Sequence, residues 1–159
     1  MSSNNIRQPN VLIIDDEPDI LDTLRLQLRT ECIIFLASGA NEGLSIMAEH
    51  NIDVVLCDQR MPGMTGDIFL ERVQQSWPRA KLILITGYSD IKAIANAVNN
   101  AHIYAYIEKP WIMDELRCIV NTAYRASIQQ SPVRPNTNAL AVASDIISEI
   151  SSHVTNNPG

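Results

Sequence analysis

The sequence lacks the features that mark several common classes of protein. Its three cysteines, Cys32, Cys57 and Cys118, are widely spaced and form no C-x-x-C or Cys/His pattern. That spacing argues against a zinc site or a redox pair, and an odd number of unpaired cysteines is typical of a reducing compartment. No signal peptide is visible, and the apolar runs are far shorter than the ~20 residues of a transmembrane helix. We therefore expect a cytoplasmic protein without a membrane partner.

Positive charge is also scarce. The chain carries 12 Lys and Arg against 18 Asp and Glu, a formal net charge of −6, and its basic residues are scattered. Nucleic-acid binding relies on a basic patch that neutralises phosphates, so we expect no nucleic-acid partner. The sequence also contains no P-loop, D-x-D loop or dinucleotide fingerprint.

What the sequence does contain is a regular alternation of apolar runs and amphipathic segments. The runs predict strands at residues 11–14, 33–36, 52–57, 81–86 and 103–107, and a helical segment follows each of them. Pro18 suits the first turn of the first helix, where its missing N–H costs nothing. A β-α order repeated five times indicates one α/β domain with a parallel sheet covered on both faces.

Helical spacing also predicts which side chains of each helix face the sheet. The residues expected to point inward are Ile20, Leu21, Leu24 and Leu28, then Leu44, Met47 and Ala48, then Ile68, Phe69, Leu70 and Val73, then Ile91, Ile94, Ala95 and Val98.

Four of the apolar runs stop on polar residues. The residues that follow them are Asp15 and Asp16, Asp58, Thr86, and Glu108 with Lys109. Ligands of open α/β sheets bind at the carboxyl ends of the strands, so we expect these side chains to converge. Three carboxylates at ~5 Å would repel one another by several kcal/mol, a cost that a hard cation such as Mg²⁺ removes.

A lysine and a hydroxyl beside such a cation favour phosphoryl chemistry. Lys109 could reach Asp58 or an anion placed there, and Thr86 offers a hydroxyl to a phosphoryl oxygen. A carboxylate in that setting is a plausible nucleophile, since aspartyl phosphates are known covalent intermediates and cations stabilise phosphoryl transfer.

These motifs resemble the response-regulator receiver domain of two-component signalling. The resemblance rests on four segments, VLIIDDEPDI, VVLCDQRMPGMTG, LILITGY and YAYIEKPW, and covers about residues 11–125. It implies a flavodoxin-like (βα)5 three-layer sandwich with a parallel sheet in the strand order 2-1-3-4-5.

The resemblance also implies a role for each site residue. Asp58 matches the phosphoacceptor, and Lys109 matches the lysine that contacts the phosphate. Mg²⁺ would be held by Asp15, Asp16, Asp58 and the backbone carbonyl of Arg60. Thr86 matches the switch hydroxyl, and Tyr106 matches the switch aromatic that turns inward as Thr86 moves toward the phosphoryl group.

The function implied is a signalling switch rather than an enzyme acting on outside substrates. Asp58 would take a phosphoryl group from a histidine kinase or phosphotransfer protein. An output protein or a second copy would dock on the face of the fourth helix, fifth strand and fifth helix. We expect a protein that stands alone or lacks its output domain. Arg60 and Tyr88 match positions that tune acyl-phosphate lifetime, and their size suggests a long-lived phosphoryl state.

The expected domain boundaries follow from composition. Residues 1–9 are polar and are expected to form a flexible arm, and residues 10–127 form the receiver domain. A linker at 128–138 contains two prolines, and apolar residues at helical spacing predict a short amphipathic helix and tail at 139–159. Two alternatives stay open: a binding module of the same fold that no longer depends on phosphate, and a Mg²⁺-dependent phosphatase.

Overall fold

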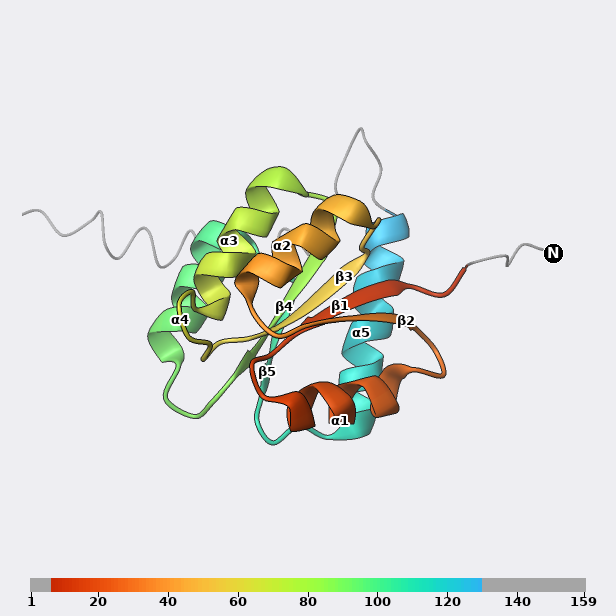
Figure 1. The fold of residues 1–159 in the computed structure, drawn as a ribbon, viewed down its shortest axis with the longest axis horizontal. Coiled ribbons are helices and arrows are strands. Elements are labelled where there is room, and N and C mark those ends of the chain that lie inside the picture. Colours follow the sequence, from red (N-terminus) through yellow and green to blue (C-terminus); the bar gives the residue numbers. More distant parts are fainter. Residues whose placement is uncertain (1–6, 130–159) are drawn as a thin grey trace, which may run out of the picture. The chain divides into compact units, whose positions relative to one another are not determined.

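The computed structural model describes residues 7–129, in which five strands and their connecting helices form a single three-layer unit (Figure 1). In chain order the elements are β1 (Asn10–Ile14), α1 (Pro18–Leu28), β2 (Ile33–Ala37), α2 (Ala40–Glu49), β3 (Val54–Asp58), α3 (Gly66–Ser76), β4 (Lys81–Thr86), α4 (Ile91–Asn96), the π-helix η1 (Ala97–Ala101), β5 (Ala105–Glu108) and α5 (Met113–Ile128). All strand pairs are parallel, in the order β2-β1-β3-β4-β5. The flavodoxin-like order expected from the motifs is therefore confirmed.

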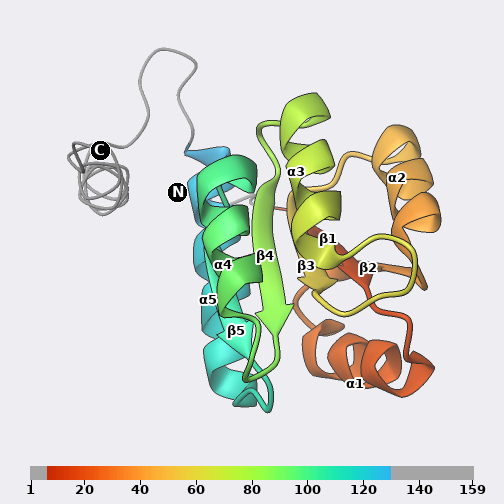
Figure 2. The ribbon, with the colours of Figure 1, turned by 90° about the vertical axis from the view of Figure 1, so that its left-hand side faces the viewer.

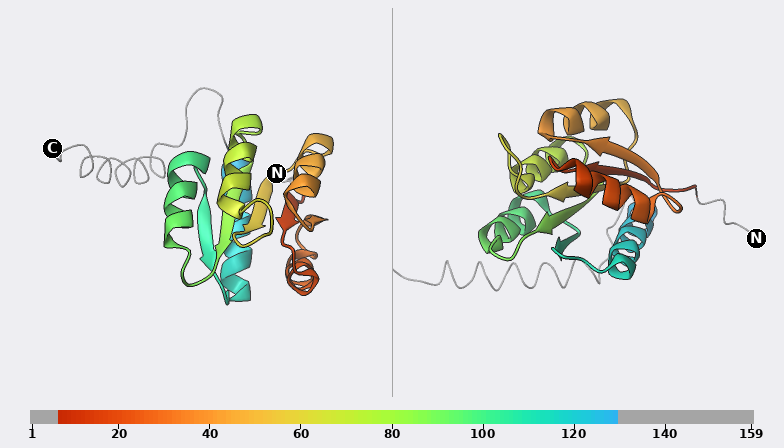
Figure 3. Two further views of the ribbon diagram at one scale, coloured as in Figure 1. Left: turned by 60° about the vertical axis from the view of Figure 1, so that its left-hand side comes forward. Right: turned by 60° about the horizontal axis from the view of Figure 1, so that its bottom comes forward.

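The sheet is buried on both faces, which explains why its central strands are continuous apolar runs. Leu12 and Ile14 of β1 pack toward α2 and α3, whereas Val11 and Ile13 pack toward α1 and α5. Figures 2 and 3 show this layering from three further directions. Because successive side chains of a strand point to opposite faces, each strand contributes to both cores.

Four side chains expected to face inward are exposed instead: Ala48, Ile68, Ile91 and Ala95. On α2 the buried residues are Gly43 and Met47, and an added Cβ on Gly43 would lie 2.9 Å from Ile14 Cδ1. In the α4–η1 segment the buried residues are Ala97 and Ala101. Helical spacing alone does not show that the buried positions at Gly43, Ala97 and Ala101 are filled by small residues.

The chain before β1 is held in place from Arg7 onward. The Arg7 guanidinium donates to both carboxylate oxygens of Asp53, at 2.8 and 2.9 Å. The Tyr124 hydroxyl of α5 donates to the Arg7 carbonyl at 2.7 Å. Arg7 thus ties Asp53, the residue before β3, to α5, although it belongs to the stretch expected to be a flexible arm.

Other expectations for the ends of the chain fall outside the described residues. They concern residues 1–6, the linker from residue 130 and the amphipathic helix. Of the helices within residues 7–129, none combines the length and the apolar character that crossing a bilayer requires.

Candidate functional site

The sheet register brings the polar ends of β1, β3, β4 and β5 to one edge. Ile14 of β1 lies opposite Cys57 of β3, so Asp15 and Asp58, one residue further along each strand, are neighbours. Asp58 in turn lies opposite Ile85, the residue before Thr86. Three carboxylate oxygens, one each from Asp15, Asp16 and Asp58, lie within 4.8 Å of one another. The structure therefore brings together the three carboxylates that the sequence analysis placed at one site.

Lys109 contacts two of these carboxylates. Its Nζ lies 2.6 Å from Asp58 Oδ1 and 3.9 Å from Asp15 Oδ2. Burial raises the pKa of Asp58 above its ordinary value, although the hydrogen bond and charge of Lys109 act against this. Burial alone would lower the pKa of Lys109, but Asp58 outweighs it and the pKa is raised. Lys109 is therefore charged at neutral pH and placed beside the carboxylate expected to react.

The ionised form of Asp15 is energetically unfavourable in this site because the carboxylate is buried. It is fully buried, and burial raises its pKa from 3.8 to about 6. Its Oδ1 accepts a hydrogen bond from the Glu17 N–H at 2.9 Å, but Oδ2 has no hydrogen-bond partner among residues 7–129. Buried polar atoms are rarely left unpaired, so this oxygen, with Asp16 exposed beside it, fits a cation ligand.

The two predicted switch residues occupy opposite environments. Thr86 is fully buried, and its hydroxyl donates to the Ile107 carbonyl of β5 at 3.4 Å, a long and weak hydrogen bond. Tyr106 of β5 exposes 46% of its surface. The structure thus shows Thr86 turned toward β5 and the Tyr106 ring partly in water. Glu108, at the end of the same strand, is exposed.

The backbone of Arg60 lies beside the site, whereas its side chain contacts the loop between β4 and α4. Its backbone N–H acts to lower the pKa of Asp58, against the larger effect of burial. The guanidinium donates to Asp90 Oδ1 at 3.2 Å and to Ser89 Oγ at 2.7 Å. Tyr88 exposes 93% of its surface. The effect of Arg60 and Tyr88 on acyl-phosphate lifetime stays a prediction.

Sequence reasoning missed several residues that shape the site. A Cβ on Gly66 would lie 2.3 Å from the Asp58 carbonyl oxygen, so only glycine allows α3 to begin this close to β3. Gln59 and Asp67 are buried polar residues joined by reciprocal hydrogen bonds. The one available signal for Gln59 was its position directly after Asp58.

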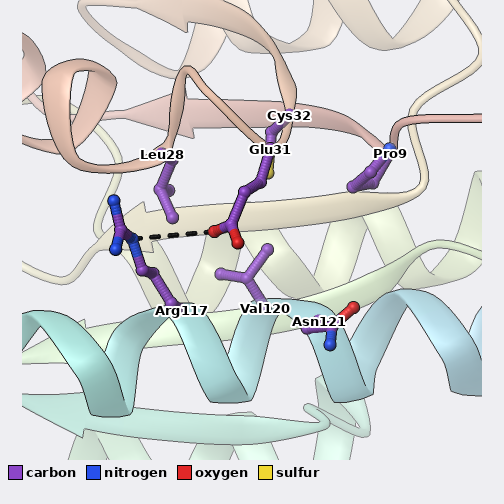
Figure 4. Close-up of a pocket in the computed structure, with 7 residues that line it drawn as sticks. All are labelled: Pro9, Leu28, Glu31, Cys32, Arg117, Val120 and Asn121. Carbon is purple, nitrogen blue, oxygen red and sulfur yellow. Dashed lines mark ion pairs between the residues drawn. The ribbon is translucent and has the colours of Figure 1, made fainter.

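Two hollows lie away from the carboxylates. A cavity of about 90 Å³ between the end of α1 and α5 is crossed by the Glu31–Arg117 ion pair, which measures 3.6 Å (Figure 4). A more open one of about 350 Å³ is lined by residues of β5, the following loop and α5, including Tyr106, Trp111 and Ile119. None of the carboxylates of the site lines either hollow.

Comparison with known proteins identifies the family. A sequence profile for the response regulator receiver domain matches residues 11–121. The hydrogenase transcriptional regulatory protein HoxA of Cupriavidus necator is 42% identical over 120 residues, which cover 76% of this chain and 25% of HoxA. The DNA-binding transcriptional regulator NtrC of Proteus hauseri is 29% identical over 145 residues, covering 91% of this chain and 30% of NtrC.

A solved structure agrees with this result. The signal receiver domain of an HD domain-containing protein from Pseudomonas fluorescens Pf-5 has a TM-score of 0.77 and 31% identity, covering 80% of this chain and 95% of that one. The chain belongs to the response-regulator receiver family. It spans only about a quarter to a third of the length of HoxA and NtrC.

Proposed function

We propose that this chain is a phosphoacceptor receiver. In this proposal Asp58 accepts a phosphoryl group from a histidine kinase or phosphotransfer protein in a Mg²⁺-dependent reaction. The observation that carries the proposal is the grouping of three carboxylate oxygens within 4.8 Å, with the Lys109 ammonium 2.6 Å from Asp58.

The residues present fit the chemistry of that transfer. Mg²⁺ would be held by Asp15, Asp16, Asp58 and the Arg60 carbonyl, and when bound it neutralises charge on the phosphoryl oxygens. An Asp58 oxygen forms the new bond to phosphorus as the phosphorus–nitrogen bond of the donor phosphohistidine breaks. Lys109 then pairs with the phosphoryl oxygens, because its ammonium already lies at Asp58.

The signal would leave the site through Thr86 and Tyr106. In this proposal the Thr86 hydroxyl leaves its 3.4 Å contact with Ile107 for a phosphoryl oxygen, and Tyr106 turns inward. The hollow beside Tyr106 belongs to the β5–α5 side of the expected docking face. An output protein or a second copy of the chain would bind the face formed by α4, β5 and α5.

The remaining expectations belong to the same proposal. The protein acts in the cytoplasm, with all three cysteines as free thiols, and it turns over only its own phosphoryl group. HoxA and NtrC carry names of transcriptional regulators, which supports an output in transcription when a longer protein is involved. The intact acidic site favours phosphorylation over a phosphate-independent binding module, and the absence of phosphatase motifs in the sequence disfavours hydrolysis of outside esters.

Labelling with a small radioactive phosphodonor tests the proposal. With Mg²⁺, the wild type should incorporate about one phosphoryl group per chain, and Asp58→Asn should incorporate none, because the amide is not a nucleophile of this kind. Asp19→Asn, an exposed change on α1, is the matched control and should label normally. Labelling that persists in Asp58→Asn, or that is unaffected by chelating Mg²⁺, would overturn the proposal.

A further inference from the structure

Helix α4 is held by little apolar packing. None of its residues, Ile91–Asn96, is buried, and Ile91 exposes 74% of its surface. The partly buried Ile94 packs against the core. The adjoining π-helix η1 differs, because Ala97 and Ala101 are fully buried and the segment packs on α3 (Figures 2 and 3). Segments with few buried contacts have low local stability. The position of α4 therefore depends strongly on polar contacts at its ends.

At the amino end of α4 the contact comes from Arg60. Its guanidinium binds the carboxylate of Asp90, the residue before the helix, and the hydroxyl of Ser89. The second Asp90 oxygen accepts the Gly87 N–H at 2.7 Å, so one carboxylate organises the whole loop after Thr86. Asp90 is about nine-tenths buried, whereas the Arg60 side chain is 69% exposed.

At the carboxyl end the contact starts at Gln59. Its amide donates to Asp67 Oδ1 at 2.9 Å and accepts the Asp67 N–H at 2.8 Å. Asn96, the last residue of α4, donates to Asp67 Oδ2 at 2.9 Å. Burial would raise the pKa of Asp67, but the hydrogen bonds from Thr65, Gln59 and Asn96 lower it, so it serves as a charged acceptor. Hydrogen bonds to a charged group are stronger than neutral ones.

Gln59 and Arg60 directly follow Asp58, so both ends of α4 are joined to the phosphoacceptor loop. We propose, resting on the function proposed above, that these two residues clamp α4 in the unphosphorylated protein and that phosphorylation of Asp58 releases it. A phosphoryl group on Asp58, two residues before Arg60, would offer the guanidinium an anion that competes with Asp90. Guanidinium groups match phosphate oxygens well. Asp67 and Asn96 act as positioning residues that hold the carboxyl end of α4.

Thermodynamic linkage predicts the direction in which weakening the clamp should change the affinity for a ligand. If the clamp stabilises only the unphosphorylated arrangement, weakening it must tighten the binding of any ligand that favours the phosphorylated one. The probe is beryllium trifluoride, a tetrahedral phosphoryl mimic, titrated into the protein with saturating Mg²⁺. Asn96→Ala removes the bond to Asp67 and also the bond that Asn96 Oδ1 accepts from Asn100. Ser89→Ala removes one bond of Arg60, and both positions lie outside the proposed phosphoryl and metal site.

Asn96→Ala should bind the mimic about three- to tenfold more tightly than the wild type, given the strength of a hydrogen bond to a charged group. Ser89→Ala should act in the same direction, and the double variant should show roughly the product of the two effects. Amide exchange in residues 91–96 should quicken by a similar factor without the mimic. Asn100→Ala, an exposed change in η1 that removes only the bond from Asn100 to Asn96, is the control and should match the wild type.

Unchanged or weaker binding in Asn96→Ala, with the fold intact by circular dichroism, would overturn the clamp, as would unchanged amide exchange. Faster exchange with unchanged affinity would reduce the contact to a purely structural one and also overturn it. A wild type that fails to bind the mimic would instead sink the proposed phosphoacceptor function, while the exchange measurement still reports on the contacts of α4.

Discussion

At the scale of single residues, the site stores unfavourable energy in Asp15. A buried carboxyl whose pKa is raised to about 6 binds its proton more tightly in the folded than in the unfolded chain. Its favourable contribution to stability is then fully present below its ordinary pKa and is lost as pH rises through about 6. Ionised Asp15 therefore destabilises the protein at neutral pH without a cation.

This cost predicts a stabilising substitution. Without Mg²⁺ at pH 7.5, Asp15→Asn should raise the free energy of unfolding by ~2–3 kcal/mol, because the amide resembles the protonated carboxyl in size and charge. The difference in the free energy of unfolding should disappear near pH 4. There the Asp15 carboxyl of the folded wild type is protonated, and so is as neutral as the amide that replaces it. Urea unfolding of both proteins across this pH range measures it. An equal difference at pH 4 and pH 7.5 would show that ionisation of Asp15 is not the cause.

At the scale of elements, the structure distinguishes those held by apolar packing from those held by polar contacts. α5 is of the first kind, with Leu116, Val120 and Ala123 buried. The segment before β1 is of the second kind, since Arg7 binds Asp53, the residue before β3, and Tyr124 of α5. The Arg7 guanidinium also lies 6.0 Å from the centre of the Tyr124 ring. Arg7 thereby joins elements that are far apart in the sequence.

Removing this link should lower stability. Arg7→Ala takes the guanidinium from the largely buried Asp53 carboxylate, which keeps the hydrogen bond from the Asn10 N–H at 2.8 Å. We expect a loss of ~1–2 kcal/mol in the free energy of unfolding, since the hydrogen-bonded partner of a charged group is lost. Denaturant unfolding measures it, with the exposed Arg29→Ala as control. A loss of the same size in Arg29→Ala would point to net charge rather than to the contact with Asp53.

At the scale of the whole molecule, the parallel sheet concentrates negative charge at one edge. The carboxyl ends of β1 and β3 place Asp15, Asp16 and Asp58 together, and Lys109 after β5 is the cation that pairs with two of them. A ligand that binds only this folded arrangement must stabilise the whole domain by linkage.

Mg²⁺ should therefore raise the unfolding temperature of the wild type. At about tenfold its dissociation constant the ion should add ~1.4 kcal/mol to the free energy of unfolding. Thermal melts with Mg²⁺ and with a chelator, at matched ionic strength, measure the shift. Asp15→Asn should lose most of it because a charged ligand is gone. A shift of equal size in that variant would mean that Mg²⁺ acts elsewhere on this acidic protein.

The sequence by itself determined the alternation of elements and the identity of the site. Strands buried on both faces must be apolar runs. A strand such as residues 11–14, followed by Asp15 and Asp16, can therefore be recognised from the sequence without coordinates. Parallel strands also share one carboxyl edge, which made the meeting of Asp58 with Asp15 predictable. These features depend on local composition and on a general rule of the fold.

Only the tertiary structure decided the contacts that depend on distance between elements. Nothing local distinguishes Gly66, or the buried Ala97, from similar residues elsewhere, because their role comes from how closely one backbone approaches another. The partners of Gln59 and Arg60 were equally hidden, since hydrogen bonds to Asp67 and Asp90 require α3 and α4 to be already in place. Helical spacing carries no information about these distances between elements. For this reason it predicted a buried Ile91, whereas the folded structure exposes that side chain to solvent.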